Sequence, residues 1–169
     1  TPVDYSDELT ALSTAYTNLE NSKKQYKQVV NPSEEFVMQR ILTVDDVADA
    51  RAVTEDQDPN GNLHKAGGYT STIYFESKTV NQSDVYVSGK YADVLIDKGT
   101  DAGGAIEVYE NVEDAEKRRD YLATYDGTIY ANGTHTVIGT VLVRTSNKLT
   151  ATQQKELEQK VIDALTRLE

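Results

Sequence analysis

The spacing of apolar residues in this chain changes near Ala48, and the change indicates the class of fold. Before Ala48, apolar residues recur every three to four positions, which is the period of a helix. After it come segments in which apolar and polar residues alternate, most clearly "YTSTIYFES" at residues 69–77. Helical spacing returns at residues 112–126 and in the last 20 or so residues. Strands clustered among helices predict an α+β fold.

The alternating segments predict one antiparallel sheet of about four to five strands with helices packed on one face. The expected strands lie in "ADARAVT", "YTSTIYFES", "GGAIEVYEN" and "GTIYANGTHTVIGTVLVRTS". The last segment is interpreted as a hairpin that turns at Asn132-Gly133, because Asn-Gly is a strong short-range hairpin signal. Its second arm is largely apolar or Thr-bearing on both sides, which predicts a central strand.

Three helices of the expected domain have recognisable N-terminal signals. Asn31 is the predicted N-cap of "NPSEEFVMQRIL", with Pro32 at the first helical position. Asn111 is the predicted cap of "VEDAEKRRDYLATYD". Thr150 and Gln153 form a capping box at the start of the last helix. These signals place a helix before, within and after the strand segments.

A long helix with a narrow apolar stripe is expected in the first 30 residues. Lys23 and Lys24 interrupt its apolar character. The positions with 3-4 spacing are Leu9, Leu12, Tyr16, Leu19, Lys23, Tyr26 and Val30. Such a helix either lies on a partner or forms a stalk, or it packs on its own domain. The segment "VVNPSEE" is the natural hinge. We therefore expect a spacer or docking helix at residues 1–30 and a single α+β domain at 31–169.

The charge of the chain disfavours two classes of partner. The 169 residues carry a net charge of −11, with a pI of about 4.6. Such a chain repels nucleic-acid phosphates and anionic membrane surfaces, so neither is an expected partner. The absence of cysteine excludes disulfides. The longest strongly apolar stretch, "VIGTVLV", is far shorter than the ~20 residues of a membrane-spanning helix.

The stretch "TEDQDPNGN", residues 54–62, suggests a calcium loop. Asp56, Asp58 and Asn60 occupy alternate positions and Gly61 follows, as in the first half of an EF-hand loop. Position 12 of such a loop, counted from Asp56, is Gly67, which has no side-chain oxygen. An EF-hand is therefore excluded, and calcium remains the one candidate cofactor.

Two interpretations of this stretch stay open. In the first, Asp56, Asp58 and Asn60 bind calcium together with an acid from elsewhere, with Asp97 or Asp101 as candidates. In the second, the stretch is an ordered turn in which the two aspartates accept backbone amide hydrogen bonds.

The sequence lacks the familiar catalytic motifs. The two histidines, His64 and His135, have no metal-ligand spacing around them, and neither G-x-S-x-G nor a phosphate-binding P-loop occurs. We therefore predict no catalytic and no cofactor-binding residues, and we expect a protein that is not an enzyme. Tyrosine is enriched, with 11 residues. Tyrosines on an exposed sheet face would bind peptide or glycan, whereas tyrosines between sheet and helices would be structural.

Three segments resemble an uncharacterised family of cell-surface lipoproteins and secreted proteins of Gram-positive bacteria. They are "VTEDQDPNGNLHKAGGYTSTIYF", "DKGTDAGGAIEVYENVEDAEKRRDYL" and "GTVLVRTSNKLTATQQKELEQ", and the resemblance extends over about residues 31–165. It implies an extracellular, cell-surface location, with membrane contact only through a lipid anchor on a cysteine that this chain does not contain. The family supplies no activity and no catalytic residues to transfer.

These observations predict a binding or scaffolding module at the cell envelope, whose partner is an unknown protein or glycan. A hydrolase with an unrecognised carboxylate site is the first alternative. A structural module stabilised by calcium is the second.

Overall fold

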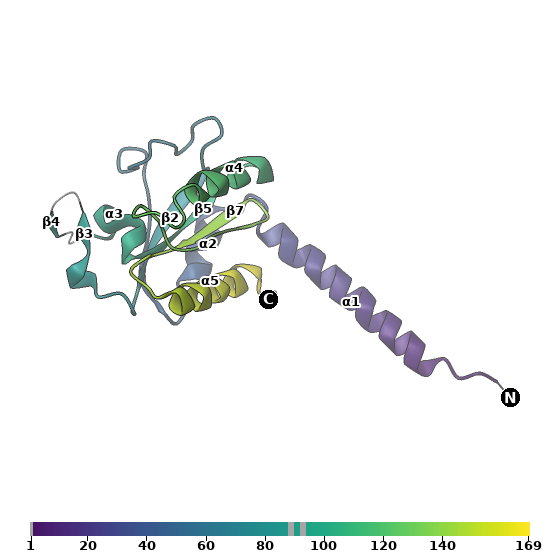
Figure 1. Ribbon diagram of the computed structural model, residues 1–169. Coiled ribbons are helices and arrows are strands. Elements are labelled where there is room, and N and C mark those ends of the chain that lie inside the picture. The colour runs from purple at the N-terminus through teal and green to yellow at the C-terminus, as the bar shows by residue number, and fades with distance from the viewer. Residues whose placement is uncertain (1, 88–89, 92–93) are drawn as a thin grey trace.

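A computed structural model describes residues 2–87, 90–91 and 94–169 and shows a sheet-containing domain with one projecting helix (Figure 1). The strands are β1 (Val47–Ala52), β2 (Ser71–Ser77), β3 (Tyr86–Val87), β4 (Lys90–Tyr91), β5 (Gly103–Val108), β6 (His135–Ile138) and β7 (Val141–Thr145). The helices are α1 (Ser6–Gln28), α2 (Glu34–Ile41), α3 (Leu95–Lys98), α4 (Val112–Ala123) and α5 (Ala151–Thr166), with short 3-10 helices η1 (Gln82–Asp84) and η2 (Gly99–Ala102).

Five strands form one antiparallel sheet in the order β1-β2-β5-β7-β6, and β3 pairs with β4 separately. The predicted α+β class, the antiparallel sheet and the long N-terminal helix are confirmed. β7 lies between β5 and β6, so the expectation of a central strand is also confirmed.

Helices cover both faces of the sheet rather than the one face that we expected. The first hydrophobic core joins α2 and α5 to one face, and two smaller cores join α4 and α3 to the other. Figure 1 shows α4 and α5 on opposite sides of the strands. The physical reason is that β5 and β7 are buried along their whole length, so both of their faces need cover. We call the two sides the α5 face and the α4 face.

Side chains of the central strands alternate between these two faces. Toward the α5 face point Ile73, Phe75, Ile106, Val108, Val141 and Val143. The residues between them belong to the α4 face, and they include Tyr74, Ala105 and Leu142. Glu107 and Arg144 also occupy this second set of positions, and both are buried. The α4 face therefore contains buried charge.

The hairpin of β6 and β7 turns at Gly139-Thr140, so the predicted turn at Asn132-Gly133 is wrong. Gly139 has a φ of 56°, the left-handed backbone that a tight turn uses. Gly133 instead sits where the chain passes close to β7. A Cβ there would lie 2.1 Å from the carbonyl oxygen of Thr145. Gly133 thus allows the backbone to pass close to Thr145 and does not reverse the chain.

The cap of α2 also differs from the prediction, because Ser33 and not Asn31 occupies the N-cap position. Asn31 adopts a φ of 44°, and its N–H donates to Oγ1 of Thr140 at 2.7 Å. The caps predicted for α4 and α5, Asn111 and Thr150, are present.

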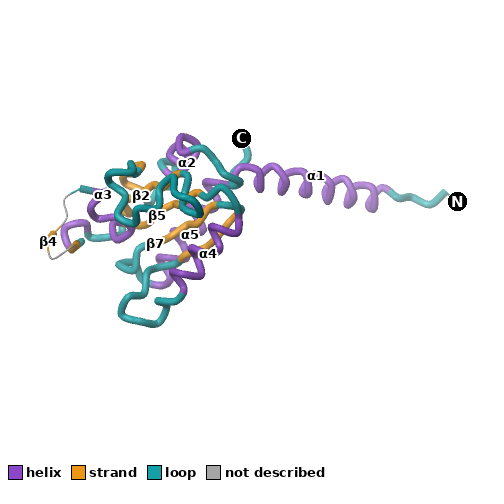
Figure 2. Tube along the Cα trace, turned by 90° about the horizontal axis from the view of Figure 1, so that it is seen from above, coloured by secondary structure: helices purple, strands orange, loops and turns teal. Residues whose placement is uncertain are grey.

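Helix α1 projects from the domain, as both views show (Figures 1 and 2). Every residue of α1 remains at least partly exposed, so the interpretation of a helix packed on its own domain is wrong. The chain enters the core at Val29, whose carbonyl oxygen accepts a hydrogen bond from the N–H of Thr140 at 2.8 Å. The Gln28 amide donates to the carbonyls of Leu165 and Arg167, each at 3.0 Å. The base of α1 is therefore fixed to the β6–β7 turn and to the end of α5.

None of the helices in the described part of the chain is long and apolar enough to cross a membrane.

Candidate functional site: a polar cleft beside α4

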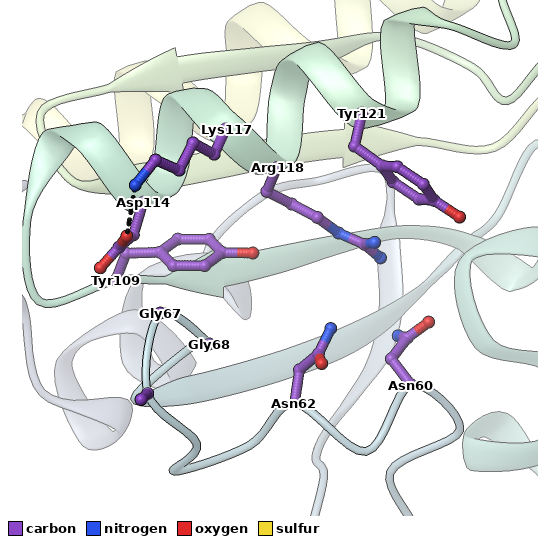
Figure 3. Close-up of a pocket in the computed structure, with 10 residues that line it drawn as sticks. Asn60, Asn62, Gly67, Gly68, Tyr109, Asp114, Lys117, Arg118 and Tyr121 are labelled. Carbon is purple, nitrogen blue, oxygen red and sulfur yellow. Dashed lines mark ion pairs between the residues drawn. The ribbon is translucent and has the colours of Figure 1, made fainter.

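A polar cleft lies between α4 and the loop that joins β1 to β2 (Figure 3). Its volume is about 410 Å³, within the range of small-molecule sites. It is lined by Asn60, Asn62, Ala66, Gly67, Gly68, Tyr109, Asp114, Lys117, Arg118 and Tyr121. The loop and the helix are far apart in the sequence, so only the fold brings them together.

One face of α4 supplies the upper wall. Its lining residues occupy positions i, i+3, i+4 and i+7 and so project from the same side of the helix; they are Asp114, Lys117, Arg118 and Tyr121. Ala115 and Leu122 are buried in the core against β7 and hold the helix on the sheet. Lys117 is paired within α4, at 3.0 Å from Glu113 and 3.7 Å from Asp114. Arg118 differs from Lys117 in that its acidic partner, Glu107, lies outside α4.

Asp58 organises the lower wall. Its carboxylate accepts hydrogen bonds from the backbone N–H groups of Asn60 at 3.0 Å, Asn62 at 2.6 Å and Leu63 at 2.9 Å, and from the hydroxyl of Tyr69. Burial opposes ionisation of this carboxylate, but the hydrogen bonds from Tyr69 and the backbone hold the pKa of Asp58 below its usual value. The turn thereby presents the Asn60 and Asn62 side chains to the cleft (Figure 3).

Two buried tyrosines support the floor of the cleft. The rings of Tyr69 and Tyr109 meet edge to face, with centroids 6.1 Å apart. The Tyr109 hydroxyl donates to Oε2 of Glu107 at 2.8 Å. Burial, reinforced by the charge of Glu107 and this hydrogen bond, raises the pKa of Tyr109 far above its ordinary value. Tyr109 is therefore a fixed neutral donor beneath the cleft.

Beneath Tyr109 lies a buried charge cluster, which we define as Glu107, Arg118 and Arg144. Glu107 is 1% exposed. Nη1 of Arg144 lies 2.8 Å from its Oε1, and Nε of Arg118 lies 3.3 Å from its Oε2. Burial opposes the charge of Glu107, but the two guanidinium groups and Tyr109 hold its pKa below the usual value. Two cations face one anion, so the cluster has one positive charge in excess.

Arg118 connects this cluster to the cleft. Its Nε is bound to Glu107, and the structure gives its terminal nitrogens, Nη1 and Nη2, no hydrogen bond to any described residue. The guanidinium carbon lies 5.5 Å from the ring centroid of Tyr121. Figure 3 shows the guanidinium pointing into the cleft toward Asn60 and Asn62. The cleft thus contains an arginine that is held on one edge and open on the other.

Of the three residues predicted to bind calcium, Asn60 alone lines the cleft, and all three make other contacts. Both oxygens of Asp58 are occupied by backbone donors and Tyr69. Asp56 accepts from the Thr54 hydroxyl at 2.6 Å, and the Asn60 amide donates to the Tyr69 hydroxyl at 3.3 Å. The donor set does not fit a calcium site without rearrangement.

The remaining candidates for a metal site give the same result. Asp97 lies in α3 and Asp101 in η2, and no group of three histidine or acidic side chains that could hold a metal occurs within the described ranges. Gly61, with a φ of 63°, reverses the chain after Asp58. The geometry favours the ordered turn, and calcium binding by Asp56, Asp58 and Asn60 stays a prediction.

The sequence reasoning missed this cleft. Glu107 and Arg144 were detectable in principle, because each is the one charged residue among apolar neighbours in "AIEVY" and "VLVRT". Opposite charges in two strands that are buried on both faces indicate a pair. The position of Arg118 had no comparable signal, since all five residues from Glu116 to Asp120 are charged.

Searches of protein-family models, curated proteins and solved structures found no match to this chain. The resemblance to surface lipoproteins therefore stays a prediction, and the functional argument rests on the cleft.

Proposed function

We propose that this protein is an extracellular binding module that holds a carboxylate-bearing ligand in the cleft beside α4. The observation that supports the proposal best is the state of Arg118. Its Nε is bound to buried Glu107, while both terminal nitrogens face a polar cleft without a partner among the described residues.

A guanidinium group in this state suits a carboxylate. Its planar fork donates two parallel hydrogen bonds to the two oxygens of one carboxylate. Because Glu107 and Tyr121 already restrain Arg118, a ligand would order fewer side-chain torsions on binding. The Asn60 and Asn62 side chains across the cleft supply neutral donors and acceptors for the rest of the ligand.

The charges around the cleft favour a singly charged group over a polyanion. Asp114 lies in the same wall, and the net charge of the chain is −11. The overall field repels a polyphosphate or a nucleic acid, whereas one carboxylate needs only the local Arg118. A volume of about 410 Å³ suits an acidic sugar or the end of a peptide. These ligands agree with the protein or glycan partner expected from the sequence.

The cleft supports binding better than hydrolysis. Carboxylate-based hydrolysis of a glycan needs two carboxyl groups that flank the reacting bond. Asp114 is the one acidic residue in the lining, and buried Glu107 is occupied by two arginines and Tyr109. The proposed cell-surface setting, through a lipid anchor outside this chain, is supported by the projecting α1, which would hold the cleft away from an anchoring surface.

The test compares the affinity of the protein for an acid with its affinity for the uncharged form of the same compound. We would titrate the protein with an N-acetylated dipeptide, with the same dipeptide as its C-terminal amide, and with a uronic acid and its neutral parent sugar, and follow binding by NMR and calorimetry. The acid of at least one pair should bind at least about tenfold more tightly than its neutral form, because only the acid pairs with Arg118.

Variants locate the effect. Arg118→Lys retains the charge beside Glu107 but lacks the fork, so affinity for the acid should fall about tenfold. Arg119→Lys is the matched control, because Arg119 is adjacent in sequence but pairs with Asp120 on the surface. Equal binding of acid and neutral forms, or equal losses in the two variants, would overturn the proposal.

A further inference from the structure

We propose that α1 pairs with α1 of a second copy of this chain in a parallel, two-stranded coiled coil. The starting observation is the spacing of the stripe on α1. Its positions follow one another at intervals of four and three without exception, and the first and last of them flank the helix: Tyr5, Leu9, Leu12, Tyr16, Leu19, Lys23, Tyr26 and Val30. This inference goes beyond the proposed function and does not depend on the cleft.

The seven-residue repeat of the stripe indicates that its partner is a second helix. A strict seven-residue repeat has a period of 3.5, whereas a straight helix has 3.6 residues per turn. On a straight helix such a stripe drifts around the axis, by about 20° in each heptad. Two helices that wind around each other with a left-handed supercoil keep the stripe at their contact. A stripe that keeps the heptad spacing at all six of its positions within α1, from Leu9 to Tyr26, therefore fits a helical partner better than a flat one.

The domain leaves this stripe uncovered. Six apolar members remain 54% to 67% exposed, namely Tyr5, Leu9, Leu12, Tyr16, Leu19 and Tyr26. Figures 1 and 2 show α1 clear of the domain from two directions. Among the described residues, the hydrogen bonds that join α1 to the domain lie at its base, at Gln28, and the buried Val29 follows directly. A second helix can thus approach almost the whole length of the stripe.

The identities of the residues favour a parallel pair of identical helices. In heptad notation, position d holds Tyr5, Leu12, Leu19 and Tyr26, and position a holds Leu9, Tyr16, Lys23 and Val30. Leucine at d is typical of parallel dimers, and a single lysine at a sets register and number of strands. In the parallel arrangement Lys23 meets its counterpart, and each already pairs with its own Glu20 at 3.0 Å. In an antiparallel pair Lys23 would face the apolar part of the partner stripe.

The area available predicts a weak, reversible dimer. Each of the six apolar side chains presents on the order of 100 Å² of surface, so two copies would bury about 1,200 Å². That value is the lower end of specific interfaces, where weak and transient complexes lie, so we expect a Kd on the order of 10 µM. Two domains on one stalk would bind a surface that displays many ligands with higher avidity than one domain.

The test is sedimentation equilibrium of the full chain from about 1 to 200 µM, a range that brackets the expected Kd. We expect a reversible monomer–dimer equilibrium. Leu12→Asp with Leu19→Asp should leave only monomer, because each layer would bury two carboxylates. Thr14→Asp with Asn21→Asp is the matched control, since these residues add the same charge at the same spacing on the opposite side of α1. The control pair should retain the dimer.

Two further variants test register and orientation. Lys23→Leu should tighten the dimer at least tenfold, because a like-charge contact becomes apolar. The chain has no cysteine, so Leu12→Cys introduces a single thiol. In a parallel pair this thiol meets its counterpart and forms an intermolecular disulfide under mild oxidation. A monomer at all concentrations, a dimer unaffected by the two aspartates, or a dimer that fails to cross-link through Leu12→Cys would each overturn the proposal.

The folding of the variants can be checked independently. The melting of the α+β domain should be the same in all of them, because every substituted residue lies on α1, where no buried position is altered.

Discussion

The two faces of the sheet are built from different chemistry although the same strands supply both. On the α5 face, the core consists of aliphatic side chains and Phe75. On the α4 face, the same strands supply Glu107, Arg144 and Tyr74, and the helix adds Arg118. In β5 the two kinds alternate directly, with Ile106 on one side and Glu107 on the other.

This difference separates a stabilising face from a face suited to recognition. Apolar burial stabilises in proportion to area, whereas a buried ion pair contributes little net stability and is costly when broken. A chain selected only for stability would place apolar residues on both faces. The α4 face retains charge next to the cleft, and the net positive charge of Glu107, Arg118 and Arg144 is available to a ligand at Arg118.

The largest expected effect comes from breaking the buried charge cluster. Glu107→Ala should lower the free energy of unfolding by about 4 kcal/mol, because it leaves two arginines without their buried anion. Ile106→Ala, one residue away on the α5 face, should cost a similar ~3 kcal/mol through loss of packing. Urea denaturation measures both values, so the size of the loss alone does not distinguish the faces.

Double substitutions distinguish them. Adding Arg144→Met to Glu107→Ala should recover about 2 kcal/mol, since the uncompensated charge of Arg144 disappears. On the α5 face, Val143 is the register partner of Ile106. Val143→Ala added to Ile106→Ala should instead increase the loss. If both pairs behaved alike, the two faces would not differ in the way described.

Acid should lower the stability of the protein through the α4 face. The loss should be smaller than that of Glu107→Ala, because protonated Glu107 still fills its site. The folded pKa of Glu107 lies below its ordinary value. Its ionisation therefore contributes stability above the ordinary carboxylate pKa of ~4.3, and this contribution is lost as pH falls toward the folded pKa. Thermal melts between neutral pH and pH 3 should show a steeper acid decline for the wild type than for Glu107→Gln.

Alkali should act on the same face through its tyrosines. Burial, with the charge of Glu107, raises the pKa of Tyr74 to about 12, and Tyr69 and Tyr109 are raised further. These groups stay protonated in the folded state, so their contribution is complete below the ordinary pKa of ~10 and is lost as pH rises above it. Tyr74→Phe should flatten this decline. Tyr130→Phe, at a residue that is 70% exposed, should leave it unchanged.

The smallest effects concern the N-terminal segment, and they show where the α5-face core begins. A chain that starts at Gln28 should have the wild-type free energy of unfolding within about 0.5 kcal/mol, because α1 has no buried residue to lose. A chain that starts at Asn31 also lacks Val29, which is 3% exposed and belongs to the α5-face core. Its loss should be about 2 kcal/mol. Equal stability of the two chains would place the boundary at residue 31, as the sequence suggested.

Local patterns predicted the elements of this fold better than their contacts. Alternation identified β2, and capping residues Asn111 and Thr150 identified the starts of α4 and α5, because these signals lie within a few residues of one another. The prediction of a turn at Asn132-Gly133 was wrong because Gly133 is needed for close packing against the backbone of Thr145, which is 12 residues away in the sequence. The cleft was missed for the same reason, because it also depends on residues that are far apart in the sequence. Asn60 and Arg118 meet only after the loop and α4 pack on the same face.

Tension applied through α1 would enter the domain at a single joint. The carbonyl of Val29 accepts from the N–H of Thr140, and Gln28 donates to the last turn of α5. Force would therefore pass into the turn between β6 and β7, and from β7 into β5 through their shared ladder. The β1–β2 loop lies outside this route, whereas α4 packs on β7 through Ala115 and Leu122. A pulled molecule would thus load its hairpin first, and the upper wall of the cleft would receive that load through β7, while the lower wall would not.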